Sequence, residues 1–327
     1  MDKKPINSIE EILTPLFRAK NILITSHVSP EGDNVGSCLG LYHGLCKMGK
    51  TANVWLKDGV PDYLRFLAGA DGILKGDYSF DLSYDTLVVV DCGELDRIGK
   101  SSIRPITEKA TVVNIDHHAT NDFFGNANWV DPNASATGEL IYRLLRKARV
   151  ELDADIAQCL YAAISADTGS FKYSNTTSEA LVVASELVKY GAKPEIVGRA
   201  LFSYFPKEKI MLMSDVFSTL ELYDDDQIAI VCVYLSMFEK TNAKPEHTEG
   251  LIDTVRNIPG VEVACFFREV DTSRTKISLR SNGRIDVARV CKIFGGGGHS
   301  MAAGAVMEAD VSRTKQHVVK TLVATLN

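Results

Sequence analysis

Histidine and acidic residues recur in four short segments of the chain, each at the end of a predicted strand or helix. Six of them would supply four carboxylates and two imidazoles without a thiolate: His27, Glu31, Asp33, Asp91, His117 and Asp167. Carboxylates gathered in one crevice repel each other, so a polyvalent cation is their natural partner. This ligand chemistry suits Mn²⁺ or Mg²⁺ better than Zn²⁺ or iron. Six ligands exceed what one metal usually takes, whereas two metals about 3.5–4 Å apart would use them all and would serve phosphoester hydrolysis.

A second group of residues, in the last third of the chain, points to phosphate binding. The glycine run 295–298 precedes a predicted helical turn, where backbone N–H groups can approach a phosphate closely. An arginine at the end of a nearby predicted strand would add a planar, bidentate donor. The predicted substrate-binding residues are Arg280, Ser281, Gly297, Gly298 and His299. A glycine run alone is more typical of a flexible connector, but the basic residues around it favour a phosphate site.

The charge of the chain is unevenly distributed. Its 327 residues carry 36 basic and 42 acidic side chains, a formal net charge of -6. Residues 1–227 hold 23 basic and 32 acidic side chains, which gives a net charge of -9. Residues 228–327 hold the remaining 13 basic and 10 acidic side chains, which gives a net charge of +3. The acidic total argues against a protein that binds long nucleic acid by charge neutralisation. The basic last part is compatible with an enzyme for the shortest nucleotides.

Composition excludes several other classes of protein. The chain is 45% hydrophobic, which is ordinary for a globular protein, and its longest apolar run has only eight residues, too few for a membrane span. The N-terminus lacks the apolar stretch of a signal peptide. Seven widely spaced cysteines without a CxxC pair indicate reduced thiols, so we expect a cytoplasmic location.

Alternating strands and helices would position the acidic and histidine residues. The predicted strands are 21–26, 51–56, 86–91 and 111–116, and the predicted helices are 34–48, 137–147, 153–165, 177–190 and 194–201. This alternation is typical of an α/β fold with a mostly parallel sheet, whose ligand crevice lies outside the carboxyl ends of the strands. Taken singly, His27 fits a loop histidine and Asp91 a helix cap. Taken together, acidic and histidine residues at four such ends predict one site.

A smaller α/β domain is predicted after the acidic turn 224–226. Its expected elements are the strands 227–235, 261–268 and 275–281 and the helices 285–294 and 312–326, preceded by a helical run at 207–222. We therefore divide the chain into a catalytic metal-binding domain (1–205), a helical linker (206–226) and a substrate-binding domain (227–327). The active site is expected in the cleft between the two domains.

The ordered set of motifs resembles the DHH phosphoesterase superfamily. The segments that look like its four motifs are His27-x3-Glu31-x-Asp33, Asp91, Asp116-His117-His118 and Asp167. The segment 295–304, Gly-Gly-Gly-Gly-His-x3-Ala-Gly, looks like the glycine-rich signature of the DHHA1 domain. The resemblance covers essentially the whole chain. At this chain length the chain resembles the nanoRNase and pAp-phosphatase branch of the superfamily, and not the RecJ exonucleases, which are larger.

The resemblance implies a role for each matching residue. One Mn²⁺ would be held by His27, Glu31 and Asp91, and the other by Asp33, Asp91, His117 and Asp167, with Asp91 bridging. Asp116 would orient the ligands and His118 would face the scissile phosphate. Arg280 and His299 would hold the terminal phosphate or backbone of the substrate. Glu31 departs from the usual Asp of the family, so the first metal would be looser or differently selected.

The sequence thus predicts a Mn²⁺-dependent phosphoesterase with two metal ions, which Mg²⁺ or another divalent ion could replace. Its expected substrates are short oligoribonucleotides, dinucleotides such as pGpG and pApA, and 3′-phosphoadenosine 5′-phosphate. Neither long duplex nucleic acid nor a membrane is an expected partner, and a homodimer is left open. Two alternatives stand beside this prediction: a pyrophosphatase or exopolyphosphatase-like hydrolase, and a non-catalytic nucleotide-binding module. Six metal ligands favour catalysis over binding alone.

Overall fold

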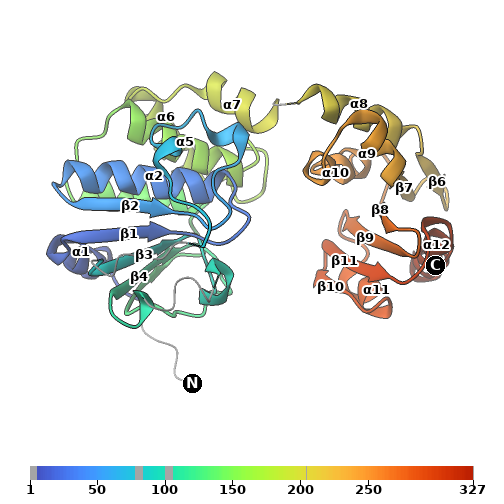
Figure 1. Cartoon of the computed structure of the whole chain (residues 1–327), viewed down its shortest axis with the longest axis horizontal. Coiled ribbons are helices and arrows are strands. Elements are labelled where there is room, and N and C mark those ends of the chain that lie inside the picture. The colour runs from blue at the N-terminus through green and yellow to red at the C-terminus, as the bar shows by residue number, and fades with distance from the viewer. Residues whose placement is uncertain (1–5, 78–83, 100–105, 204, 327) are drawn as a thin grey trace. The chain divides into compact units, whose positions relative to one another are not determined.

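The computed structural model describes residues 6–77, 84–99, 106–203 and 205–326 (Figure 1). The chain divides into two compact units, Met1–Tyr204 and Phe205–Asn327. The segment expected as a helical linker belongs to the second unit, because helix α8 (Lys207–Phe217) buries Leu212 and Val216 in a core cluster of that unit. This helix is also shorter than expected, since strand β6 (Glu221–Tyr223) follows it and pairs with β7.

The first unit is built on a parallel sheet with the strand order β2-β1-β3-β4-β5. Its strands are β1 (Asn21–Thr25), β2 (Thr51–Trp55), β3 (Thr86–Val90), β4 (Thr111–Asp116) and β5 (Ala127–Val130). All five residues of β3 are buried, as expected for a central strand covered on both faces. The four predicted strands are confirmed. β5 was not predicted, because four residues are too few to show a period.

Helices of the first unit begin and end close to the predicted positions. They are α1 (Ile9–Arg18), α2 (Gly32–Lys47), α4 (Thr137–Lys147), α5 (Ala154–Asp167), α6 (Ser178–Lys189) and α7 (Pro194–Phe202). Short 3₁₀ turns are η1 (Asp62–Leu64), η2 (Ala70–Gly72) and η3 (Leu95–Ile98). Ser8 and Glu11 form the capping box that opens α1.

Close packing of α2 against α5 brings two distant parts of the chain together. A Cβ at Gly36 would lie 2.5 Å from the carbonyl oxygen of Cys159, and a Cβ at Gly32 would lie 2.3 Å from the Cβ of Ala166. Only glycine at these positions allows the two helices to approach so closely. The start of α2 therefore lies against the end of α5, which carries Asp167.

The second unit has a mixed sheet with the order β10-β11-β9-β8-β7-β6. Its remaining strands are β7 (Ile228–Val233), β8 (Val263–Asp271), β9 (Arg274–Ser281), β10 (Gly297–His299) and β11 (Ala302–Met307). Its remaining helices are α9 (Leu235–Thr241), η4 (Pro245–Thr248), α10 (Leu251–Arg256), α11 (Val287–Ile293) and α12 (Val311–Leu326). Only β7 and β8 are parallel neighbours within this sheet.

The glycine run differs from its prediction. Instead of leading into a helical turn, Gly297–His299 form β10, which pairs antiparallel with β11 in a tight hairpin. Gly298 has a φ of 143°, and a Cβ there would lie 2.5 Å from the carbonyl oxygen of Ala302. The glycines thus serve the close approach of two strands.

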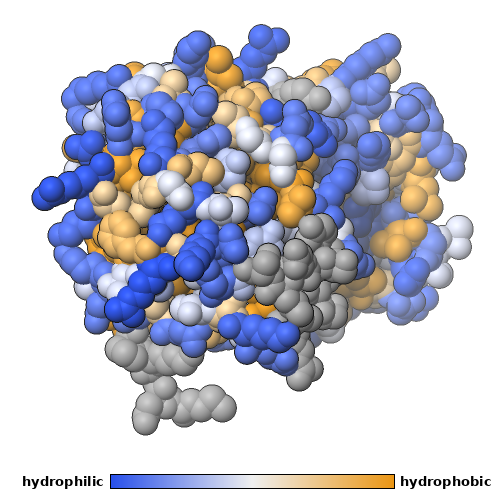
Figure 2. Space-filling view, turned by 60° about the vertical axis from the view of Figure 1, so that its left-hand side comes forward, coloured by the Kyte–Doolittle hydropathy of each residue, from blue (hydrophilic) through white to orange (hydrophobic). Residues whose placement is uncertain are grey.

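Surface and thiol chemistry agree with the composition. All seven cysteines are free thiols. On the face of the molecule shown in Figure 2, apolar side chains are interspersed with hydrophilic ones. None of the helices in the described part of the chain has the length and apolar character of a membrane span.

Candidate active site

The carboxyl ends of three neighbouring strands carry the central residues of the site. β1 leads into His27, β3 leads into Asp91, and β4 ends at Asp116, which is followed by two histidines. Side chains at this edge of a parallel sheet converge on one crevice. The α2–α5 contact adds Asp33 and Asp167 to the same place.

His117 lies between carboxylates from different segments. Its Nε2 is 3.1 Å from Oδ2 of Asp167 and 3.6 Å from Oδ1 of Asp91. Two groups have ligand atoms within 4.8 Å of one another: Asp33 with His117 and Asp167, and Asp91 with His117 and His118. Four of the six predicted metal ligands are therefore brought together. The Nδ1 atom of His117 is 3.3 Å from the carbonyl oxygen of Ala134; a proton placed there leaves Nε2 free to bind a cation.

Asp91 is held in one orientation by neighbours that the sequence did not reveal. Its backbone has a φ of 52°, in the left-handed region, which aspartate tolerates better than most residues. Asn34 donates a 2.6 Å hydrogen bond from Nδ2 to Asp91 Oδ2, and Thr137 donates from Oγ1 to Oδ1 at 3.1 Å. These bonds keep Oδ1 on the side of the histidines.

Asp33 is fully buried and is fixed by the first turn of α4. The backbone N–H groups of Thr137 and Gly138 donate to its two carboxylate oxygens at 2.7 and 2.9 Å, and Ser37 donates from its hydroxyl at 2.7 Å. Such hydrogen bonds hold the carboxylate in one orientation. They also tie α2 to α4, so the ligand is positioned by two helices.

Asp116 and His118 form a hydrogen-bonded pair. His118 Nδ1 is 2.7 Å from Asp116 Oδ1, and Asn121 donates to Asp116 Oδ2 at 2.5 Å. The hydrogen bond to Asp116 raises the pKa of His118 above its ordinary value, despite partial burial. Although burial acts to raise the pKa of Asp116, the bond and charge of His118 bring it below its usual value. The pair therefore favours a charged imidazolium on a charged carboxylate.

The other two predicted ligands, His27 and Glu31, are not part of these two groups. His27 is buried, its Nδ1 lies 2.6 Å from the carbonyl oxygen of Val28, and burial lowers its pKa. Glu31 precedes α2, and its charge is close enough to contribute to the raised pKa of Asp167. Their role as ligands of a first metal remains a prediction.

The electrostatics of the cluster fit a divalent cation. Burial, followed by the charges of Asp33, Glu31 and Asp116, raises the pKa of Asp167 to about 8. Burial and the neighbouring charges of Asp33, Asp167 and Asp116 raise the pKa of Asp91 well above its usual range. Carboxylates that resist ionisation because they face each other are stabilised by a shared cation. Oxygen and imidazole donors in this arrangement suit Mn²⁺ or Mg²⁺.

In the second unit, Arg280 lines a pocket of about 280 Å³. His299 is exposed at the end of β10, and it pairs with Ala302, which in turn pairs with Arg280 on the next strand. Arg280 therefore lies on β9 and Gly298 and His299 lie on β10, with β11 between these two strands at one edge of the sheet.

Ser281 is a correction to the predicted substrate-binding set. It is fully buried, donates from its hydroxyl to Glu262 Oε1 at 3.0 Å, and accepts from the N–H of Gly283. Side chains alternate along a strand, so the neighbour of Arg280 points to the opposite face. Ser278, two residues before Arg280, lines the pocket instead. Because side chains on one face of a strand are two residues apart, the sequence alone could have identified Ser278 as the neighbour of Arg280 on the same face.

Comparison with known proteins identifies the family. Residues 21–164 match the DHH family, N-terminal domain, and residues 225–327 match the DHHA1 domain. A protein of Thermus thermophilus named bifunctional oligoribonuclease and PAP phosphatase NrnA is 34% identical, over 92% of this chain and 89% of its own length. The chain belongs to the DHH family of phosphoesterases.

Solved structures agree with a DHH–DHHA1 fold. An exopolyphosphatase-related protein from Bacteroides fragilis is 30% identical with a TM-score of 0.86, over 97% of this chain and 95% of that protein. RecJ from Thermus thermophilus, solved in complex with Mn²⁺, is 12% identical with a TM-score of 0.53, over 99% of this chain and 55% of RecJ. The similarity to RecJ concerns the fold alone. The expected α/β fold, an N-terminal parallel-sheet domain followed by a DHHA1 domain, is confirmed.

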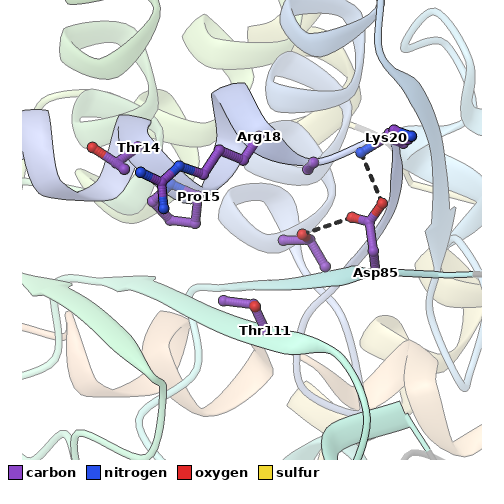
Figure 3. A pocket seen from close by; sticks show the side chains of 8 residues that line it. Thr14, Pro15, Arg18, Lys20, Asp85 and Thr111 are labelled. Carbon is purple, nitrogen blue, oxygen red and sulfur yellow. Dashed lines mark hydrogen bonds between the residues drawn. The ribbon is translucent and has the colours of Figure 1, made fainter.

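A larger pocket of the DHH domain is not the active site. It measures about 370 Å³ and is lined by Arg18, Lys20, Asp85, Thr86 and Thr111 among others (Figure 3). Arg18 ends α1, and the other four residues lie at the amino ends of β1, β3 and β4, the opposite edge of the sheet from Asp91. The Asp85 carboxylate is already engaged by the N–H groups of Lys20 and Asn21 and by the Thr86 hydroxyl. This pocket therefore lacks the converging ligands of the carboxyl edge.

Proposed function

We propose that this protein is a Mn²⁺-dependent phosphoesterase that hydrolyses short oligoribonucleotides, including dinucleotides such as pGpG and pApA, and 3′-phosphoadenosine 5′-phosphate. The observation that carries the proposal is the position of His117 between Asp91 and Asp167, with Asp33 beside them. The name of the Thermus relative, an oligoribonuclease and PAP phosphatase, supports the choice of substrates.

Two divalent cations would be held at the carboxyl edge of the parallel sheet. Asp33, Asp91, His117 and Asp167 would hold one, and His27, Glu31 and Asp91 the other. When bound, the cations supply positive charge for the phosphate oxygens and make a water nucleophilic near neutral pH. The oxygen and imidazole donors of the cluster support the choice of metal. Glu31, one methylene longer than aspartate, would make the site formed by His27, Glu31 and Asp91 the weaker of the two.

The residues of the chain itself have separate tasks in the reaction. Asn34 and Thr137 hold the Asp91 carboxylate, and the start of α4 holds Asp33, so neither has to reorient when substrate binds. His118, kept protonated by Asp116, would donate a hydrogen bond to a non-bridging phosphate oxygen and stabilise the charge that develops there. Arg280 and His299 of the DHHA1 domain would bind a terminal phosphate or the backbone of the substrate.

A second candidate is hydrolysis of inorganic polyphosphate or pyrophosphate. The name of the Bacteroides fragilis protein, exopolyphosphatase-related, favours it, because that protein is 30% identical over nearly the whole chain. A metal centre that contacts only phosphate oxygens does not distinguish these substrates from nucleotides. Discrimination would have to come from the DHHA1 domain.

A substrate panel tests the proposal. The purified chain with Mn²⁺ is incubated with 3′-phosphoadenosine 5′-phosphate, di- to pentaribonucleotides, pGpG, pyrophosphate and short polyphosphate, and products are separated by ion-exchange chromatography. We expect nucleotide substrates to be consumed at least tenfold faster than the inorganic ones. The reverse order would establish the second candidate, and no hydrolysis of any substrate would contradict both. The variant His117→Ala identifies activity from a contaminating enzyme, since such activity would survive the substitution.

A further inference from the structure

One face of the DHHA1 sheet is only half covered. Helices α11 and α12 pack on one side, where Ile277, Leu279 and Ala303 are buried. On the other side, α8 and α10 cover β7 and part of β8 in a separate core cluster. Beyond α10 this second side is open: Lys276 and Val306 are exposed there.

Two cations face each other on the open side without a matching negative charge. Arg268 on β8 and Lys276 on β9 are direct cross-strand partners. Like charges placed opposite each other destabilise a sheet. Neither side chain has a hydrogen-bond or ion-pair partner among the residues that the structure describes. Such a pair is stabilised when an anion binds between the two groups.

The pair lines the same pocket as Arg280. Alternate residues of the β8–β9 ladder line it: Phe266 and Arg268 on β8, and Lys276, Ser278 and Arg280 on β9. The carboxylates that line the pocket are those of Glu249 and Asp253. Asp253 lies 3.2 Å from the guanidinium of Arg256 and 3.9 Å from that of Arg280, and the charge of Glu249 acts on Lys209. Neither carboxylate forms an ion pair with Arg268 or Lys276 in the described part of the chain.

The spacing of these donors matches a linear polyanion. Lys276, Ser278 and Arg280 alternate along one face of β9, which separates the two cations by about 13 Å along the strand. A hydroxyl lies between them. Grooves that bind single strands follow the backbone with such spaced cations. A single phosphate could contact one end of this row but not both.

We infer that Arg268 and Lys276 form a second phosphate subsite, which binds a backbone phosphate of an oligoribonucleotide remote from the one that Arg280 binds. This inference rests on the proposed function and deepens it. The subsite gives longer substrates an additional contact that a compound with one phosphate lacks. It therefore contributes to the preference for short RNA over smaller phosphoesters.

The test compares the double variant Arg268→Gln/Lys276→Gln with the wild-type chain on two substrates, pApApA and bis(p-nitrophenyl) phosphate. We expect the KM for pApApA to rise about tenfold, while kcat for this substrate changes less than twofold. The dependence of log KM on log salt concentration should become shallower by about 0.7 for the lost phosphate contact. The KM for bis(p-nitrophenyl) phosphate, which has one phosphate, should change less than twofold.

A matched control removes the same charge from another place. Arg289→Gln/Lys292→Gln lies on α11, which packs on the opposite face of the sheet, and it should leave the KM for pApApA and its salt dependence within twofold of wild type. An equal rise of KM in both double variants, on both substrates, would show a general charge effect and overturn the subsite. An unchanged KM for pApApA would overturn it as well.

A direct binding measurement separates this inference from the proposed function. If the wild-type chain hydrolyses none of the phosphoesters, the proposed function is wrong, but binding of fluorescently labelled pApApA can still be measured by anisotropy. About tenfold weaker binding by Arg268→Gln/Lys276→Gln, and not by the control variant, supports the subsite. Equal binding by the wild-type chain and both double variants contradicts it.

Discussion

The two units of this chain concentrate charge in opposite ways. In the DHH domain, acidic side chains from four segments are buried against each other, and burial raises the pKa values of Asp91 and Asp167. In the DHHA1 domain, Arg268 and Lys276 are opposed on an open sheet face that water reaches. Repulsion between buried charges is strong, because the surrounding dielectric is low, whereas repulsion between solvated charges is weak and screened by salt. The first arrangement would be strongly stabilised by a bound cation, and the second would be stabilised more weakly by an anion.

The largest expected effect comes from removing a buried carboxylate. Asp91→Asn keeps the size of the side chain but removes the charge shared between the two proposed metals. We expect kcat to fall at least ~1000-fold, since metal coordination contributes several kcal/mol to transition-state stabilisation. Activity is measured on pApApA, and Mn²⁺ content by elemental analysis. Asp155→Asn, an exposed position on α5, is the matched control and should retain activity and metal. Full activity of Asp91→Asn would contradict the metal centre.

The second effect is on stability as a function of pH. A carboxyl whose pKa is raised in the folded state adds stability below its ordinary pKa near 4, and that stability is lost as the pH rises through the folded value. For Asp167 this value is about 8. The metal-free protein should therefore lose on the order of 2 kcal/mol of unfolding free energy between pH 5 and pH 8, allowing for solvent screening.

This loss is measured by urea unfolding with a chelator present. Mn²⁺ should restore stability more at pH 8 than at pH 5, because the cation stabilises the ionised carboxylates. Asp167→Asn serves as the control and should show a flatter pH dependence without metal. A metal-free wild-type protein that is more stable at pH 8 than at pH 5 would refute the electrostatic description of the cluster.

A third, smaller effect separates ligands from the residues that position them. Asn34→Ala removes the hydrogen bond to Asp91 Oδ2, and also the bond that Asn34 accepts from the backbone N–H of Glu31, but substitutes none of the proposed ligands. We expect about tenfold weaker Mn²⁺ binding, within the usual range for a residue that orients a ligand. Calorimetric titration with Mn²⁺ measures it, and saturating metal should recover most of the activity. If metal binding is unchanged, Asp91 is oriented by Thr137 alone.

The sequence was sufficient to predict the cluster of acidic and histidine side chains but not the residues that hold this cluster in place. Asp33, Asp91, His117 and Asp167 could be predicted because their types are unusual at the ends of apolar strands and helices, and because a parallel sheet brings those ends together. The roles of Asn34 and Asn121 could not, since asparagine in a loop or a first helical turn is common. Their contacts depend on side-chain orientation, which no sequence period encodes.

Long helices and strands were predicted from the sequence more reliably than short ones. Central strands such as β3 and helices such as α4 have clear periods, and both were found. The short elements β5, α9 and α10 were missed, because four to seven residues show less than two periods of a helix or strand pattern. The glycine run predicts a phosphate-binding turn, whereas its closest contacts are with β11. Glycine permits both conformations, so tertiary contacts decided between them.

The smallest expected effect distinguishes two adjacent residues of the DHHA1 domain. Arg280 lines the open pocket, whereas Ser281 is buried and bonded to Glu262. Ser281→Ala should lower the unfolding free energy by about 1 kcal/mol, because Glu262 loses one of its hydrogen bonds, and should leave the KM for pApApA unchanged. Arg280→Ala should instead raise that KM about tenfold with little change in stability. Thermal unfolding and steady-state kinetics on both variants separate the two effects. If Ser281→Ala raised the KM as much as Arg280→Ala, the alternation of faces along β9 could not explain substrate binding, and the original prediction for Ser281 would stand.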